Sequence, residues 1–562
     1  MAIQAPAFNA WLDDFFGSYY RHRPVNATFI GVHEHDHRLP DYSERGVDEV
    51  VSEMKELLRR LRSLPDEALS EAETLDRMLA EGFLEIQLWE HDSHHFHRGN
   101  PCVYTGEAVF GVMSLFLRPF APFSERVESA VRRLAAVSVL LEQGKHNLRR
   151  APKEWTRRAI RECSGALNFL REGIEQLKKE EGAEDSRIRE AADRAEEAFI
   201  DFRKYLESEL LYKTSGHYSC GEDALSLLIQ RGHFLNKDAS EIEELAAEKI
   251  AESAGQLESH AGDFGASNWQ NALGQLSGAR PNVHQYYGRY QEVWNACRHL
   301  VEENRLLTWP DYPIRYVPQP TWTRKAAPYL YFLFYRSPAP FDRVPIVDYL
   351  VTPVDKDMAA EEQERLLRSN NDSVIKLNHV VHHGGPGHHV QNWHAFRASS
   401  RIGQMAAVDC ATRVAMFCGG TMAEGWACYA TDLMDEYGFL TPLERYAEHH
   451  ARLRMAGRAL VDVRLHRGII TLEEAASFYQ ERIRISREAA LNEAVKNSMF
   501  PGTALMYLVG TELIHELRRE LVGETYSGLS LCNFHDRFLS YGSVPVSLIA
   551  KAMRRRAGMR GT

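Results

Sequence analysis

Six histidines lie within the sixteen residues 379–394, and a Gly-Gly-Pro-Gly sequence at 384–387 divides them into two groups. Imidazole is the commonest metal ligand among protein side chains and titrates near physiological pH. A histidine group of this density is costly to bury unless something binds it. This segment therefore constrains the fold most strongly, because the rest of the chain is expected to act as a scaffold that holds it.

The glycine-proline break is expected to decide which histidines meet. A helix is predicted over about 361–383, and in an unbroken helix His382 and His388 would lie on different faces. The glycines permit unusual backbone angles, and Pro386 interrupts the hydrogen-bond ladder. The break can therefore bring His388, or its neighbour His389, back towards His382.

A carboxylate on a later helix offers a further ligand. Residues 422–432 predict a buried helix that carries Glu424 near its start. An unpaired buried carboxylate costs several kcal/mol, and either a metal or a histidine would satisfy it. Two histidines followed by a glutamate from a later helix form a known zinc pattern that leaves one position open for water.

The remaining sequence predicts a mainly α-helical protein. Apolar residues recur at helical spacing over 46–99 and 122–255, and residues 361–522 return to helix. A small β-sheet is expected before the histidine segment, because three short stretches are rich in aromatic and β-branched residues: 313–317, 329–335 and 347–351. We expect an N-terminal helical region at 1–310 and a metal-binding region at 311–562, or one continuous fold containing both.

The net charge and the cysteine content limit which partners and which cellular location are expected. The formal net charge of −11 argues against a nucleic-acid partner. The eight cysteines are scattered without a CxxC pair, which is typical of free thiols in a reducing compartment. No signal peptide and no apolar segment of about 18 residues is present. We therefore predict a cytoplasmic protein that binds a small-molecule substrate and no membrane, with its oligomeric state left open.

Three motifs carry a family resemblance. Residues 382–391, His-His-Gly-Gly-Pro-Gly-His-His-Val-Gln, resemble the motif His-Glu-x-x-Pro-Gly-His-His-x-Gln. Residues 424–429 match Glu-Gly-Trp-Ala-x-Tyr, and residues 500–510 resemble a third, Pro-Gly-containing motif. The chain thus resembles the bacterial DUF885 family, which is similar to zincin-like metallopeptidases, and the match spans nearly the whole sequence.

The resemblance implies a mainly helical, zincin-like fold with metal ligation by His382, His388 and Glu424. One departure bears directly on the chemistry. The glutamate of the first motif, which in zincins is the general base, is His383 in this chain. His383 is expected to act either as the base or as an additional ligand. Ordinary peptidase activity is therefore not implied.

Two further residues are candidates for catalysis. Tyr507 lies in the third motif and can donate a hydrogen bond to a developing oxyanion, although a core tyrosine fits the pattern equally well. Lys496 aligns with a family arginine and can hold a substrate carboxylate as a point charge, although it also fits a solvated helix face.

The predicted function is a metal-dependent hydrolase that acts on a small amide, ester or carboxylate-bearing metabolite with metal-activated water. Zinc is the expected metal, with iron or manganese as alternatives. A non-hydrolytic, oxygen-using iron enzyme is the first rival, because histidine and carboxylate ligands also suit iron. A catalytically inactive descendant that binds a ligand is the second, because the motif glutamate is lost.

Overall fold

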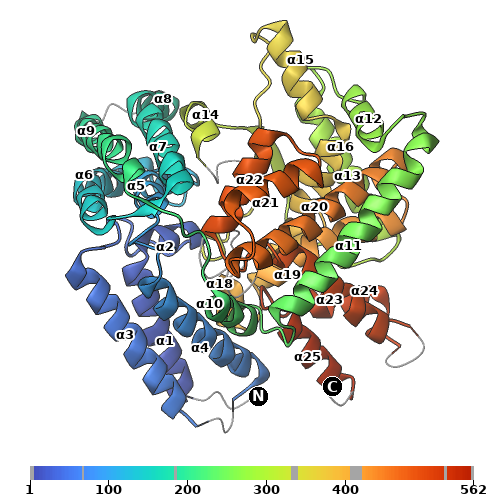
Figure 1. Cartoon of the computed structure of the whole chain (residues 1–562), viewed down its shortest axis with the longest axis horizontal. Coiled ribbons are helices and arrows are strands. Elements are labelled where there is room, and N and C mark those ends of the chain that lie inside the picture. Colours follow the sequence, from blue (N-terminus) through green and yellow to red (C-terminus); the bar gives the residue numbers. More distant parts are fainter. Residues whose placement is uncertain are drawn as a thin grey trace.

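The computed structural model is mainly helical, which confirms the predicted class (Figure 1). It describes residues 6–65, 69–182, 186–330, 339–405, 420–523 and 528–558. The N-terminal helices are α1 (Pro6–His22), α2 (Pro24–Ile30), α3 (Glu44–Ser63), α4 (Glu71–Asp92), α5 (Cys102–Met113), α6 (Phe123–Asn147), α7 (Lys153–Asn168), α8 (Ile174–Glu181), α9 (Ser186–Ser208) and α10 (Glu222–Leu227).

The remaining helices surround the histidine segment or follow it. Those of the central part are α11 (Ala239–His260), α12 (Trp269–Gly274), α13 (Tyr286–Glu303), α14 (Thr321–Arg324), α15 (Ala360–Ser369), α16 (Asp372–Val374), the π-helix η8 (Ile375–Gly384), α17 (His388–Ala395) and α18 (Arg401–Met405). Those of the C-terminal part are α19 (Gly420–Glu436), α20 (Pro442–His466), α21 (Leu472–Glu481), α22 (Arg487–Met499), α23 (Met506–Leu521), α24 (Leu531–Leu539) and α25 (Val546–Arg556). Short 3₁₀ or π turns are η1 (Ser114–Phe116), η2 (Phe169–Gly173), η3 (Leu210–Tyr212), η4 (Leu228–Gly232), η5 (Ala261–Phe264), η6 (Gln275–Gly278) and η7 (Ala327–Tyr329).

A two-stranded sheet precedes the histidine segment, as predicted. Strand β3 (Ile314–Pro318) pairs in parallel with β4 (Val347–Val351), and Ile314 lies opposite Val347. The third expected strand, 329–335, falls mostly outside the described residues. A second, shorter parallel pair joins β1 (Ala151–Pro152) to β2 (Thr214–Ser215).

The apolar cores draw on distant parts of the chain. The largest buried cluster combines Phe15 and Leu79 with Trp426 and Ile549. Another contains Trp155 from α7 together with residues of α11, α20 and α23, and the Trp155 indole Nε1 donates to Ser498 Oγ at 2.8 Å. Buried contacts thus cross the predicted division at residues 310 and 311, which stays a prediction.

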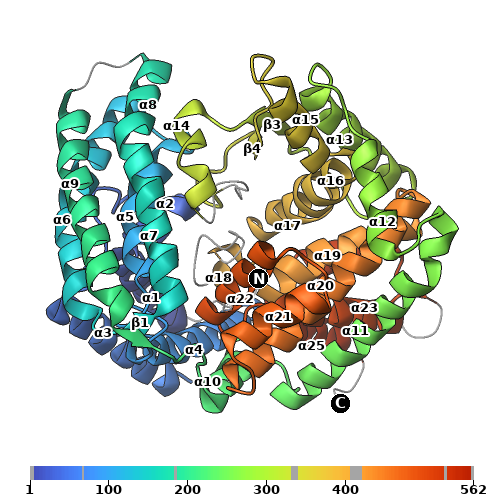
Figure 2. The same cartoon turned by 45° about the horizontal axis from the view of Figure 1, so that its top comes forward.

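Four helices form the framework on which the candidate site is built. Helix α11 packs along α20, and α19 packs along α23 (Figure 2). The second pair approaches closely because glycines face each other, so that a Cβ atom on Gly425 would lie 2.6 Å from the Gly510 backbone. Helix α20 begins with a capping box between Thr441 and Glu444. No helix in the described part of the chain is long and apolar enough to cross a membrane.

Candidate metal centre

The first histidines lie on a π-helix rather than on the single α-helix predicted over 361–383. The segment is divided into α15, the short α16 and then η8. In a π-helix the hydrogen bonds join residues five apart, and such turns are frequent at functional sites. The side chain of His383 is tied to the same helix, because its Nδ1–H donates to the carbonyl of Asn378 at 2.7 Å.

The Gly-Gly-Pro-Gly turn folds the chain back, and two buried tryptophans hold it. The indole of Trp294 donates to the Gly384 carbonyl and that of Trp426 donates to the Pro386 carbonyl, each at 2.8 Å. The Gly387 amide donates to the Val381 carbonyl at 3.0 Å. Helix α17 then begins directly with the second pair of histidines. The turn is therefore part of the buried core and not a solvated loop.

We expect Gly387→Ala to disrupt this turn. A methyl group at residue 387 would collide with the carbonyl of His382, which is backbone and cannot rotate away. The collision shifts the turn and moves His388 away from His382, so metal affinity should fall by at least about tenfold, as it does when ligand orientation is lost. Titration of the purified variant with zinc measures the loss. Gly288→Ala is the control, because open space surrounds Gly288.

The turn brings His388 to His382, as expected. The ring centroids of His382 and His388 are 4.9 Å apart, and those of His383 and His388 are 5.4 Å apart. One ring nitrogen from each of these three histidines lies within 4.8 Å of the others. His389 points elsewhere, because its Nε2–H donates to the Tyr312 carbonyl at 2.6 Å. His388, and not His389, therefore faces the cluster, and its role as a metal ligand stays a prediction.

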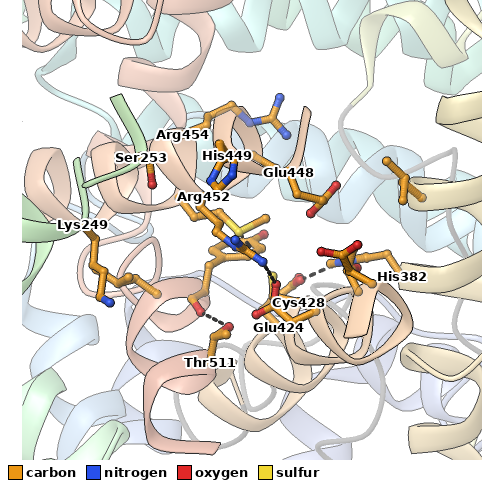
Figure 3. A pocket seen from close by; sticks show the side chains of 18 of the residues that line it. Lys249, Ser253, His382, Glu424, Cys428, Glu448, His449, Arg452, Arg454 and Thr511 are labelled. Atoms are coloured by element: carbon orange, nitrogen blue, oxygen red, sulfur yellow. Dashed lines mark hydrogen bonds and ion pairs between the residues drawn. The ribbon is translucent and has the colours of Figure 1, made fainter. Parts of the chain in front are cut away.

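Glu424 on α19 faces two of these histidines. Its Oε2 lies 3.4 Å from His382 Nε2 (Figure 3). The same oxygen lies 3.6 Å from His388 Nε2. That oxygen is buried and has no hydrogen-bond partner among the described residues. Two ligand atoms bound at about 2.1 Å to a tetrahedral ion are about 3.4 Å apart. The spacing therefore fits a shared metal ion better than a direct hydrogen bond.

Protonation in the cluster also suits metal binding. Burial alone would raise the pKa of Glu424, but the facing imidazoles of His382 and His388 hold that pKa well below its ordinary value. Burial and the two neighbouring histidines hold the pKa of His383 well below its ordinary value, so its ring is neutral. Gln391 accepts from His388 Nδ1 at 3.1 Å, which fixes the ring of His388 with its Nε2 towards Glu424.

A cavity of 640 Å³ opens beside the cluster. It is lined by residues of η8, α19, α20, α23 and α11, including His382, His383, Glu424 and Tyr507. The ring of Tyr507 lies under the guanidinium of Arg458, 5.2 Å from ring centroid to Cζ. The predicted residues of η8, α19 and α23 are thus brought to one cavity.

Lys496 is the predicted catalytic residue that lies apart from this cavity. It is on α22, and it does not belong to the lining of the cavity among the described residues. Its positive charge contributes instead to lowering the pKa of Glu493 on the same helix. The structure therefore places Lys496 outside the lining of the cavity, which corrects its predicted position in the reacting part of the site.

Two lining residues of α20 have no counterpart in the sequence-based prediction. Burial, followed by the charge of Asp432, raises the pKa of Glu448 to about 7. Arg454 has a buried Nε without a hydrogen-bond partner in the described part of the chain. Neither residue belongs to a motif, and charges along a long helix ordinarily indicate a solvated face. No sequence signal distinguishes them.

Comparisons with known proteins give the family and the fold. The profile of the DUF885 family, described as "Bacterial protein of unknown function", matches residues 24–553. A solved structure of a predicted lipoprotein of unknown function from Shewanella oneidensis is similar at 20% identity and a TM-score of 0.78, over 98% of this chain and 100% of that one. One of a predicted lipoprotein from Colwellia psychrerythraea has 16% identity and a TM-score of 0.74, over 98% and 99%. No curated protein matches the chain.

Proposed function

The chain belongs to the DUF885 family, and we propose that this member is a metal-dependent hydrolase of zincin-like descent. His382, His388 and Glu424 hold the metal, and His383 stands where the zincin motif has its glutamate. Zinc in this position would polarise a substrate carbonyl and lower the pKa of a water molecule. The observation that carries the proposal is the buried, unbonded Oε2 of Glu424, 3.4 and 3.6 Å from two imidazole nitrogens.

The hydrogen bond of His383 supports a role as a ligand rather than as the base. Its Nδ1–H is taken by the Asn378 carbonyl, so its remaining lone pair is on Nε2, in the cluster with His382 and His388. A neutral imidazole with this orientation suits a further ligand position. The proton acceptor of the hydrolysis is then Glu448, whose pKa of about 7 matches proton transfer near neutral pH.

The cavity also limits the substrate. Its volume of 640 Å³ is in the range of small-molecule sites, roughly 300–1,000 Å³. A small amide or ester fits such a cavity better than a long peptide. Tyr507 lines the same cavity and supplies a hydroxyl group to donate to the oxyanion that forms at the reacting carbonyl.

The third histidine of the cluster, His383, supports the main alternative, which is an oxygen-using iron enzyme. Three histidines and one glutamate also suit iron, which would make oxygen chemistry the alternative. The inactive ligand-binding descendant is less well supported, because Glu424 Oε2, 3.4 and 3.6 Å from two histidine nitrogens, makes no hydrogen bond with a described residue. Both solved neighbours are described as lipoproteins, so they lend no support to the cytoplasmic location, which stays a prediction.

Metal analysis of protein purified without added metal tests the proposal. We expect about one zinc per chain, together with hydrolysis of members of a panel of small amides and esters. Chelation should abolish the hydrolysis and added zinc should restore it. Stoichiometric iron with oxygen uptake would favour the rival, and a folded protein that binds no metal would favour the inactive descendant.

A further inference from the structure

Three arginines of α20 line the cavity, and two of them are neutralised by a carboxylate. Arg452 pairs with Asp432 of α19. Arg458 makes a two-pronged pair with Glu493 of α22, with nitrogen–oxygen distances of 2.6 and 2.7 Å. Bidentate pairs of this kind fix both partners and leave little charge for a ligand.

Arg454 differs from its two neighbours. It makes no ion pair and no hydrogen bond with any residue that the structure describes, and its Nε is buried. The nearby Arg458, and then burial, lower the pKa of its guanidinium. A buried donor without an acceptor is unfavourable, because it loses its hydrogen bonds to water without replacement. Such a group in a cavity wall is explained most simply by an acceptor that arrives with the ligand.

The charges around Arg454 favour an anionic ligand. Arg454, Arg458 and Lys496 all act on one carboxylate, that of Glu493. Although burial raises the pKa of Glu493, these cations lower it to about 2. Because Glu493 is already paired with Arg458, Arg454 has no carboxylate partner of its own among the described residues.

Glu448, the carboxylate of α20 that lines the cavity, does not pair with Arg454. Glu448 is six residues from Arg454, which places the two about 120° apart around α20. In Figure 3, Glu448 lies between Arg454 at the top and Glu424 with His382 below, and all four residues line the cavity. Arg454 and the histidines His382 and His383 thus line the same cavity.

We propose that Arg454 binds a carboxylate group of the substrate, so that the substrate is a small amide or ester with a free carboxylate, such as an N-acyl amino acid. This proposal rests on the proposed hydrolase function for the bond that is cleaved. A singly charged carboxylate suits the site better than a phosphate, because acidic side chains outnumber Lys and Arg among the lining residues of the cavity. The planar guanidinium binds a carboxylate through two parallel hydrogen bonds.

Binding to the metal-free protein tests this subsite without requiring catalysis. The probes are N-benzoyl derivatives of glycine, alanine and phenylalanine, each compared with its C-terminal amide by calorimetry. Removing the metal prevents the carboxylate from binding to it instead. We expect at least one acid to bind the wild type about tenfold or more tightly than its amide, as a charge-assisted pair requires. Arg454→Met should remove this difference, and Arg454→Lys should keep part of it.

Arg519→Met is the matched control. Arg519 also lines the cavity but is exposed, so this variant should keep the preference for the acid. Equal binding of acids and amides by the wild type would overturn the carboxylate subsite, whatever the protein hydrolyses. If the acids bind through Arg454 while no metal supports hydrolysis, the subsite stands and the proposed hydrolase fails. Thermal unfolding of each variant shows whether the fold is kept.

Discussion

Glu424→Gln should yield a folded protein that no longer retains zinc and has no detectable hydrolysis. The change keeps the size of the side chain and removes the negative charge that faces His382 and His388 at 3.4 and 3.6 Å. Loss of an outer partner of a metal ligand already costs 10–100-fold in affinity, so loss of a ligand charge should cost more than about 100-fold. Competition with a chromophoric zinc chelator measures the affinity.

The folded state of this variant distinguishes a metal site from a structural ion pair. Without metal, Glu424 is a buried carboxylate with an unbonded oxygen, whereas an amide can donate to the lone pair of a facing imidazole. The two imidazoles that hold the pKa of Glu424 low also stabilise its carboxylate in the metal-free protein, so the metal-free variant should be no more stable to heat than the metal-free wild type. Zinc should raise the melting temperature of the wild type only.

Glu512→Gln provides the control for this experiment. Glu512 lines the same cavity, but it faces Lys249 at 3.5 Å and lies outside the histidine cluster. Its zinc affinity should equal that of the wild type. Stoichiometric zinc in purified Glu424→Gln would show that Glu424 is not a ligand and would remove the basis of the proposed function.

The predictable part of the site is the part that is local in sequence. His382 and His388 are six residues apart, and the intervening glycines and proline are enough to predict a turn that brings them together. Glu424 was predicted because a lone carboxylate in an apolar helix needs a partner. The helices and the small sheet follow from apolar periodicity and β-branched composition in the same way.

The features that the sequence does not predict depend on packing between distant elements. A π-helix differs from an α-helix by one residue in each hydrogen bond, a shift that apolar periodicity does not record, so η8 was predicted as a regular helix. Glu448 and Arg454 belong to a charged helix whose pattern predicts solvent exposure. They line a cavity only because α11, α19 and α23 pack around α20. The predicted position of Lys496 differs from the structure for the converse reason. Its place in the motif does not specify on which side of α22 the side chain lies.

Glu448→Gln should lower kcat/KM by roughly 10²–10⁴-fold without loss of zinc, because general-base catalysis contributes an effect of this size. The carboxyl group lines the cavity beside the histidine cluster, and burial with the charges of Asp432 and Asp435 outweighs Arg452 and Arg454 to raise its pKa to about 7. Glu448→Asp should recover part of the activity. Zinc content, measured on the same samples, separates proton transfer from metal binding.

The pH profile identifies the residue that accepts the proton. A base must be deprotonated to act, so wild-type kcat/KM should rise about tenfold per pH unit up to about pH 7 and then level off. Glu448→Gln should lose this acid limb. His383 cannot supply it, because burial and two neighbouring imidazoles hold its pKa well below the ordinary value. An unchanged acid limb in the variant would assign the proton transfer to another group.

Stability provides a second readout that does not depend on the substrate. A carboxyl group whose pKa is raised in the folded state favours folding when protonated, so its ionisation destabilises the protein as the pH rises from the unfolded value of about 4.5 through about 7. Glutamine stays neutral at every pH. Glu448→Gln should therefore be roughly 1–3 kcal/mol more stable than the wild type at pH 8 and nearly equal to it at pH 4.5. Urea unfolding at the two pH values measures this difference. If the variant is no more stable than the wild type at pH 8, Glu448 is ionised without cost, and its pKa is that of an ordinary surface carboxylate.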